Sequence, residues 1–225
     1  MEQLFQQKLG IPMVQGYGLT ETSPTATRRP WTDNKPGSIG ILIPNTEIKI
    51  VDVFSGRELG PNEVGEIWIR GPQVMKGYHN RPEETNNMVD EEGWLHSGDI
   101  GYYDEEEHFY ATDRIKELIK YKGFQVAPAE LESLLLTHPG ISEAAVTSVP
   151  DQEAGELPVA YVVLKDKARI SEHDIIHYVA ERAASFKHLR GGVHIVDNIP
   201  KTDTGKLLRR VLKEQAAKDM KRSNL

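Results

Sequence analysis

Residues 16–21 read Gly-Tyr-Gly-Leu-Thr-Glu and combine features that suit close approach of a ligand. Glycine on either side of Tyr17 lets backbone approach a ligand closely, and the tyrosine ring offers a flat surface for stacking. Thr20 adds a hydroxyl, and Glu21 adds a carboxylate of the kind that holds Mg²⁺. The apolar run Ile11–Val14 in front of them indicates a strand. Taken alone, these residues favour a tight turn between strands in which the threonine is a cap.

A second segment, residues 93–99 (Gly-Trp-Leu-His-Ser-Gly-Asp), places Asp99 directly after a glycine. A carboxylate there can accept hydrogen bonds from the two vicinal hydroxyls of a ribose. Because Gly-Asp is also a common turn dipeptide, the segment by itself leaves both interpretations open.

A third segment, residues 113–126, carries four cations between apolar residues: Arg114, Lys116, Lys120 and Lys122. They lead into Gly123, and Gln125 follows. A solvated, charged strand is the ordinary interpretation of such a stretch.

The fourth segment, residues 200–206 (Pro-Lys-Thr-Asp-Thr-Gly-Lys), resembles a phosphate-binding P-loop only superficially. The P-loop pattern requires a glycine where Pro200 stands and a Ser or Thr where Leu207 stands. What remains is Lys206 at a glycine-marked turn before a helix. Such a lysine is a mobile point charge suited to a phosphate or carboxylate oxygen.

The elements that must position these segments differ along the chain. In the first half, short β-branched runs bounded by Gly and Pro indicate antiparallel strands, as in a small barrel or an edge subdomain. A short helix is expected after Pro82, and a hairpin over residues 94–112 with the acidic residues 104–107 as solvated turn carboxylates. The expected strands are Ile39–Ile43, Glu47–Val53 and Glu66–Arg70.

After Asp113 helices and strands mix in a compact α+β pattern. Two domains are therefore expected, residues 1–112 and 113–225, with α/β and α+β architecture. The expected helices are Pro128–Thr137, a helix capped by Ser171 with Ile175, Ile176, Val179, Ala180 and Ala183 on its apolar face, and Gly205–Met220; the expected strands are Glu143–Val149, Val159–Leu164 and Val193–Val196.

Composition narrows the classes of function. The 225 residues carry a formal net charge of -7, which gives no electrostatic reason to expect nucleic acid as a partner. There is no cysteine, so disulfides, thiolate catalysis and cysteine-bound metals are excluded. No apolar run approaches the roughly 20 residues of a membrane span. His173 and His177 could face one metal ion, but two histidines without a third ligand are ordinary surface residues.

Together the four segments closely resemble the adenylate-forming superfamily of acyl-CoA synthetases, 4-coumarate–CoA ligases and beetle luciferases. The resemblance runs from residue 15 to residue 206, and residues 93–100 and 119–132 are especially similar to the coumarate-ligase and luciferase branch. It implies the end of the large adenylate-forming domain, a small β-rich subdomain, followed by the whole small mobile C-terminal domain.

The resemblance also implies a role for each matching position. Gly16, Tyr17 and Gly18 would form the adenine site with Tyr17 stacked on the base, Thr20 would contact the adenylate phosphate and Glu21 would hold Mg²⁺. Asp99 would accept the ribose hydroxyls beside Arg114, and Lys116 would be the hinge. Lys120, Gly123 and Gln125 would serve the thioester step with coenzyme A, and Lys206 would reach the reacting carboxylate and α-phosphate.

The implied function is ATP-dependent activation of a carboxylic acid to acyl-AMP, followed by transfer to coenzyme A. The family's phosphate loop and most of its acyl pocket should lie upstream of Gly16, so a truncated and inactive chain is expected. Three alternatives stay open: a luciferase-type monooxygenase, a carrier-loading adenylation domain, and a non-catalytic binding module.

The last three residues, Ser223-Asn224-Leu225, differ in their middle position from the peroxisomal address Ser-Lys-Leu. Import by the peroxisomal receptor is the expectation, and a frayed helix end in a cytoplasmic protein is the alternative.

Overall fold

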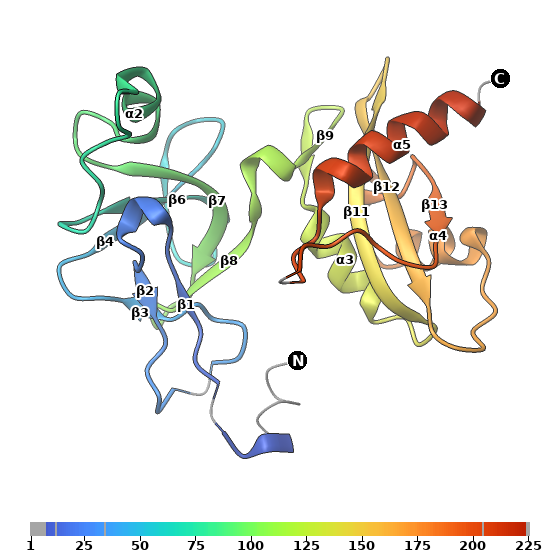
Figure 1. Cartoon of the computed structure of the whole chain (residues 1–225), viewed down its shortest axis with the longest axis horizontal. Coiled ribbons are helices and arrows are strands. Elements are labelled where there is room, and N and C mark those ends of the chain that lie inside the picture. The colour runs from blue at the N-terminus through green and yellow to red at the C-terminus, as the bar shows by residue number, and fades with distance from the viewer. Residues whose placement is uncertain (1–7, 12, 34, 204, 224–225) are drawn as a thin grey trace. The chain divides into compact units, whose positions relative to one another are not determined.

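A computed structural model describes residues 8–11, 13–33, 35–203 and 205–223. The chain divides into two compact units, Met1–Ile115 and Lys116–Leu225, and each is described by itself (Figure 1). The expected boundary at residues 112/113 falls within the last strand of the first unit. The last two residues of the suggested peroxisomal address lie outside the described part of the chain. In that part, no helix is long and apolar enough to cross a membrane.

The first unit is built from two antiparallel sheets. A five-stranded sheet has the order β5-β4-β6-β7-β8, and a three-stranded sheet has the order β1-β2-β3. Backbone hydrogen bonds between Ile39, Gly40 and Phe109 join the two sheets. The strands are β1 (Gly16–Tyr17), β2 (Thr27–Arg28), β3 (Ile41–Leu42), β4 (Glu47–Val51), β5 (Glu58–Leu59), β6 (Gly65–Arg70), β7 (Leu95–Tyr103) and β8 (Phe109–Arg114).

Alternation along the strands sets the core of this unit. In β6 the residues Gly65, Ile67 and Ile69 are buried while their neighbours are less so, as expected of a strand with one face on a core. Ile67 and Ile69 pack with Ile50 of β4 and Leu95 of β7. Helix α2 (Pro82–Met88) covers little of this core, since none of its residues is buried.

The second unit is a single five-stranded sheet with helices on both faces. The long hairpin of β11 (Ile141–Asp151) and β12 (Gly155–Leu164) places β11 at one edge of the sheet. β12 also pairs with β9 (Ile119–Tyr121), which continues to β10 (Phe124–Val126), and with the parallel strand β13 (Val193–Ile195). The helices are α3 (Pro128–Leu136), α4 (Glu172–Ala180) and α5 (Arg209–Ser223).

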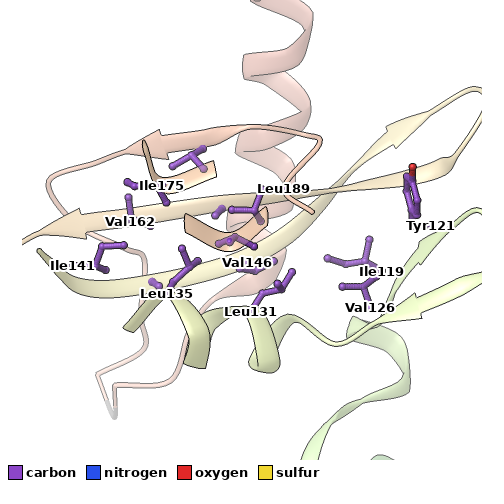
Figure 2. Close-up of a cluster of buried hydrophobic side chains, with 14 of the residues drawn as sticks. Ile119, Tyr121, Val126, Leu131, Leu135, Ile141, Val146, Val162, Ile175 and Leu189 are labelled. Atoms are coloured by element: carbon purple, nitrogen blue, oxygen red, sulfur yellow. The ribbon is translucent and has the colours of Figure 1, made fainter. Parts of the chain in front are cut away.

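Strand parity divides the interior of this unit into two cores. Val146 and Val162 face α3 and α4, where Leu131, Leu135 and Ile175 complete the larger core (Figure 2). The alternate residues of the same two strands face α5, against the buried Leu212 and Ala216; they are Ala145, Val149, Val159 and Tyr161.

Most expected elements are present, with some corrections. The strand expected over residues 11–14 is wrong: Ile11, Met13 and Val14 are not in a strand, and β1 begins at Gly16. The proline in that run has no N–H to donate to a strand partner. The final helix begins at Arg209 rather than at Gly205. The helix capped by Ser171 ends at Ala180, so Ala183 lies beyond it, and the Ser171 hydroxyl accepts from the Asp174 N–H as expected. The two-residue strands β2 and β5 and the β9–β10 hairpin were not predicted as such.

Candidate active site

The Gly-Tyr-Gly segment is held against the chain's own backbone. A Cβ on Gly18 would lie 1.7 Å from the carbonyl oxygen of Pro24, and one on Gly16 would lie 3.0 Å from that of Thr27. Glycine at residue 18 is therefore required by close packing within the unit. The sequence left two interpretations of this segment open: a tight turn packed on the protein, or a loop that faces a ligand. The two are compatible, because Gly16, Gly18 and Thr20 remain exposed although the segment packs against residues 24 and 27.

Tyr17, Asp99 and Arg114 come together in the first unit. The Tyr17 hydroxyl donates to Asp99 Oδ2 at 2.8 Å, and Arg114 Nε lies 3.2 Å from Asp99 Oδ1. Cross-strand pairing of Asp99 in β7 with Arg114 in β8 sets the second contact. Burial, and then the charge of Asp99, raise the pKa of the Tyr17 phenol above its ordinary value of 10.0. The phenol thus remains a hydrogen-bond donor, and Asp99, 7% exposed, is oriented from both sides.

Glu66 of β6 holds the backbone of β7 at the residue before Asp99. Its Oε1 accepts from the Gly98 N–H at 2.9 Å, and its Oε2 accepts from Trp68 Nε1 at 2.8 Å. Gly98 lies within β7, where the pairing with β6 shifts register between Glu66 and Trp68. Its φ of +71° favours glycine at this irregularity, so the segment is a distorted strand and not a turn. The sequence did not reveal Glu66, since nothing in a strand sequence indicates which distant backbone group a side chain will bind.

Glu21 lies in a short 3-10 turn, Thr20–Thr22, and has one partner that the sequence did not reveal. Tyr78 donates its hydroxyl to Glu21 Oε1 at 2.6 Å, and this bond raises the pKa of Tyr78 to about 12. Mg²⁺ is commonly held by one or two carboxylates together with substrate phosphates. A single oriented glutamate fits that donor set. Among the described residues there is no cluster of three or more potential metal ligands, so His173 and His177 are not part of one.

The β9–β10 hairpin carries the residues expected to serve the thioester step. Lys120 and Gln125 are cross-strand partners, and the Lys120 N–H donates to Glu156 Oε2 at 3.0 Å. Lys122 and Gly123 form the two-residue turn with φ values of +47° and +83°, the left-handed pair that tight hairpins prefer. A Cβ on Gly123 would meet nothing within 4 Å, so the tip of the hairpin is open.

Lys116 is exposed in a second 3-10 turn, Ile115–Glu117. The division between the two compact units falls between Ile115 and Lys116, inside this turn. A short turn with an exposed side chain at the junction is where a change of backbone dihedrals disturbs least packing.

Lys206 is exposed on a closed turn that precedes α5. The turn is formed by backbone hydrogen bonds from Thr202 N to Lys206 O and from Gly205 N to Thr202 O, both 2.8 Å. The Lys206 N–H also donates to Thr202 Oγ1 at 3.1 Å. The lysine is therefore presented at a turn before the helix, rather than on the first turn of the helix itself.

Two family models match the chain: AMP-binding enzyme over residues 1–79 and AMP-binding enzyme C-terminal domain over residues 130–206. The chain belongs to the adenylate-forming superfamily. Its fold is that of adenylate-forming enzyme domains.

Among named relatives, luciferin 4-monooxygenase of Photinus pyralis is 54% identical over 200 residues, which are 89% of this chain and 36% of the relative. A 4-coumarate–CoA ligase-like protein of Oryza sativa subsp. japonica is 51% identical over 225 residues, 97% of this chain and 40% of the relative. The crystal structure of ATP-bound MatB from Rhodopseudomonas palustris matches with a TM-score of 0.88 and 33% identity, covering 95% of this chain and 42% of MatB. The chain thus spans about two fifths of the length of these proteins.

Proposed function

We propose that this chain supplies the nucleotide-facing turn, the hinge and the mobile unit of an acid–CoA ligase that forms AMP. The observation that carries the proposal is the contact of Tyr17 and Arg114 with the two oxygens of Asp99. A buried, oriented carboxylate beside an aromatic ring suits the ribose and base of a nucleotide. The ATP-bound state of the related MatB is consistent with that ligand.

In the first half-reaction, a carboxylate oxygen of the acid attacks the α-phosphorus of ATP. The bond from that phosphorus to the bridging oxygen breaks, and pyrophosphate leaves. The attacking and transferring groups are both anionic, so a cation that reaches them lowers the barrier by positioning and charge. Lys206, on its exposed turn, would supply that ammonium, and Thr20 would hydrogen-bond the α-phosphate. Mg²⁺ held at Glu21 would offset further charge on the phosphates.

In the second half-reaction, the thiol sulfur of coenzyme A attacks the acyl carbon and AMP leaves. We propose that rotation about Lys116 withdraws Lys206 and brings the β9–β10 hairpin to the acyl-adenylate. Its open tip at Gly123 leaves room for the pantetheine arm, and Lys120 and Gln125 flank that approach on paired strands.

A luciferase-type monooxygenase is the second candidate, because the Photinus pyralis luciferase is 54% identical to this chain. Both activities begin with the same adenylation, so the residues assigned to that step serve either.

A chimera tests the function. Residues 1–225 would replace the matching region of the rice 4-coumarate–CoA ligase-like relative, which is 51% identical over this span. We expect acid-dependent ATP–pyrophosphate exchange and thioester formation from the chimera, and none from the purified 225-residue chain. A parallel chimera with the Photinus pyralis luciferase, assayed for light with luciferin, tests the second candidate. A folded chimera without exchange, while its parent is active, would contradict the proposal.

We further propose peroxisomal import through the C-terminal tripeptide. Removing residues 223–225 from a fluorescent fusion should then abolish peroxisomal localisation, and an unchanged distribution would contradict this proposal.

A further inference from the structure

Arg209, three residues after Lys206, contacts three separate elements of the second unit. Its Nη2 donates to Glu132 Oε2 of α3 at 2.9 Å, and its Nη1 bonds the other oxygen of that carboxylate. Nη1 also donates to the carbonyl oxygen of Val146 in β11 at 3.0 Å, while Nε lies 2.6 Å from a carboxylate oxygen of Glu117. One guanidinium thus joins α5, α3, β11 and the end of the turn that contains Lys116.

This contact is largely shielded from solvent. The side chains of Arg209 and Glu132 are 19% and 11% exposed, and Glu132 also accepts the Val146 N–H at 2.8 Å. A carboxylate buried at this level requires a partner, because an unpaired buried charge is strongly destabilising. The next residue offers a contrast: Arg210 is 86% exposed and pairs with Glu214 one turn along the same helix.

The loop that carries Lys206 closes directly before Arg209 in the chain. The Leu208 N–H donates to the Pro200 carbonyl at 3.0 Å, which closes residues 200–208 into a loop. Arg209 is the first residue of α5 and directly follows that closure. The contacts of Arg209 with α3 and β11 therefore hold the base of the loop in place. The position of Lys206 can then change only through movement within the loop.

We propose that Arg209 is a positioning residue for Lys206, acting through its bidentate pair with Glu132. The contact with Glu117 extends the effect, so that the lysine loop and the small unit's side of the hinge move as one body. This inference rests on the proposed function for its catalytic meaning but makes a structural claim that stands without it.

The structural claim is tested on the 225-residue chain itself by amide hydrogen exchange. Arg209→Ala should accelerate exchange at the Thr202 and Gly205 amides by about tenfold or more, while the β11–β12 amides keep their protection. Arg210→Ala is the matched control and should change neither. If Arg209→Ala prevents folding, Glu132→Gln keeps an oxygen for the Val146 N–H and removes the charge and the second acceptor of the pair with Arg209. Unchanged exchange at Thr202 and Gly205 in the folded variant would overturn the proposal.

The catalytic meaning is tested in the ligase chimera. Arg209→Ala should lower kcat for adenylation by about tenfold or more while the KM for ATP changes little, and Arg209→Lys should recover part of the loss. Thioester formation from supplied acyl-AMP should change far less. Equal losses in both half-reactions would show that Arg209 supports only the stability of the unit. Because the exchange measurement needs no activity, an inactive chimera would count against the proposed function and leave the structural claim to be decided separately.

Discussion

The two units present their candidate functional side chains in opposite ways. In the first unit, Asp99 is buried and its two carboxylate oxygens are already engaged by Tyr17 and Arg114. In the second unit, Lys206 and Gly123 stand exposed on turns. The contacts that hold those turns are made by less exposed groups: the Arg209 guanidinium with Glu132, and Glu156 with the Lys120 N–H.

Under the proposed function, the difference separates a preorganised ribose acceptor at Asp99, here called the receptor, from Lys206, here called the delivered group, which reaches the nucleotide for one step. A ribose acceptor gains from being oriented before the nucleotide arrives, because less ordering is left to do on binding. A lysine needed for one step gains from exposure, since a buried ammonium would lose its charge or require a permanent partner. Each of the following substitutions tests either the receptor or the delivered group, or a turn that supports one of them.

The largest effect is expected at the delivered group. Lys206→Ala in the ligase chimera should slow acyl-AMP formation by about a hundredfold or more, because the ammonium is needed where charge develops. Thioester formation from supplied acyl-AMP should stay within about threefold. Measuring the two half-reactions separately decides the point. Lys201→Ala is the control in the same loop, since Lys201 pairs with Glu143 at 2.7 Å.

A smaller effect is expected at the receptor. Asp99→Asn removes the charged acceptor and its pair with Arg114, so AMP affinity should fall by about tenfold or more. Tyr17→Phe keeps the ring and loses only the bond to Asp99, so its loss should be smaller. Titration of each variant of the chimera with AMP, followed by calorimetry, gives the two dissociation constants. A larger loss for Tyr17→Phe would mean that the phenol, rather than the carboxylate, dominates binding.

At the hairpin tip, the expected effect concerns backbone strain alone. Gly123→Ala should lower the free energy of unfolding of the chain by about 1 kcal/mol, because φ is +83° but no atom lies within 4 Å of the new Cβ. Gly123→Asn should cost less, since asparagine tolerates the left-handed region. Urea denaturation measures both variants. A cost well above that of strain would reveal a packing role for this open turn.

The smallest effect is expected from pH. Burial raises the pKa of the Glu156 carboxyl, but bonds from Lys213, the Lys120 N–H and Ser148 outweigh it and hold that pKa below its ordinary 4.5. A depressed pKa stabilises the folded state above the unfolded value, and this contribution is lost as pH falls through the folded value. Glu156→Gln should therefore flatten the dependence of unfolding free energy on pH below about 4.5, while leaving the trend near pH 7 unchanged. If the variant and the parent chain lose stability identically at acid pH, Glu156 does not stabilise β9 through its charge.

The centres of long strands and the start of one capped helix were predictable because their signals are local. Ser171 indicated the start of α4, and the strands expected over residues 143–149 and 159–164 lie within β11 and β12. The two-residue strands β2 and β5 were missed, because so few residues carry no detectable period.

The same distinction applies to the site. Tyr17 and Asp99 stood out through their glycine neighbours, and the structure brings the two into contact. Glu66, Tyr78 and Arg209 did not stand out, because each acts on a residue far away along the chain and has an ordinary sequence environment. Supporting residues of this kind become visible only when strand register and loop paths are known.

The covering of the second unit's sheet is uneven, and this has a thermal consequence. α3 and α4 bury a broad apolar set, whereas α5 rests on Leu212 and Ala216 as its buried apolar residues in the described part of the helix. Such a layer separates at a lower free-energy cost than the hairpin beneath it. Because Lys206 precedes α5, warming the ligase chimera should abolish adenylation before the sheet itself melts.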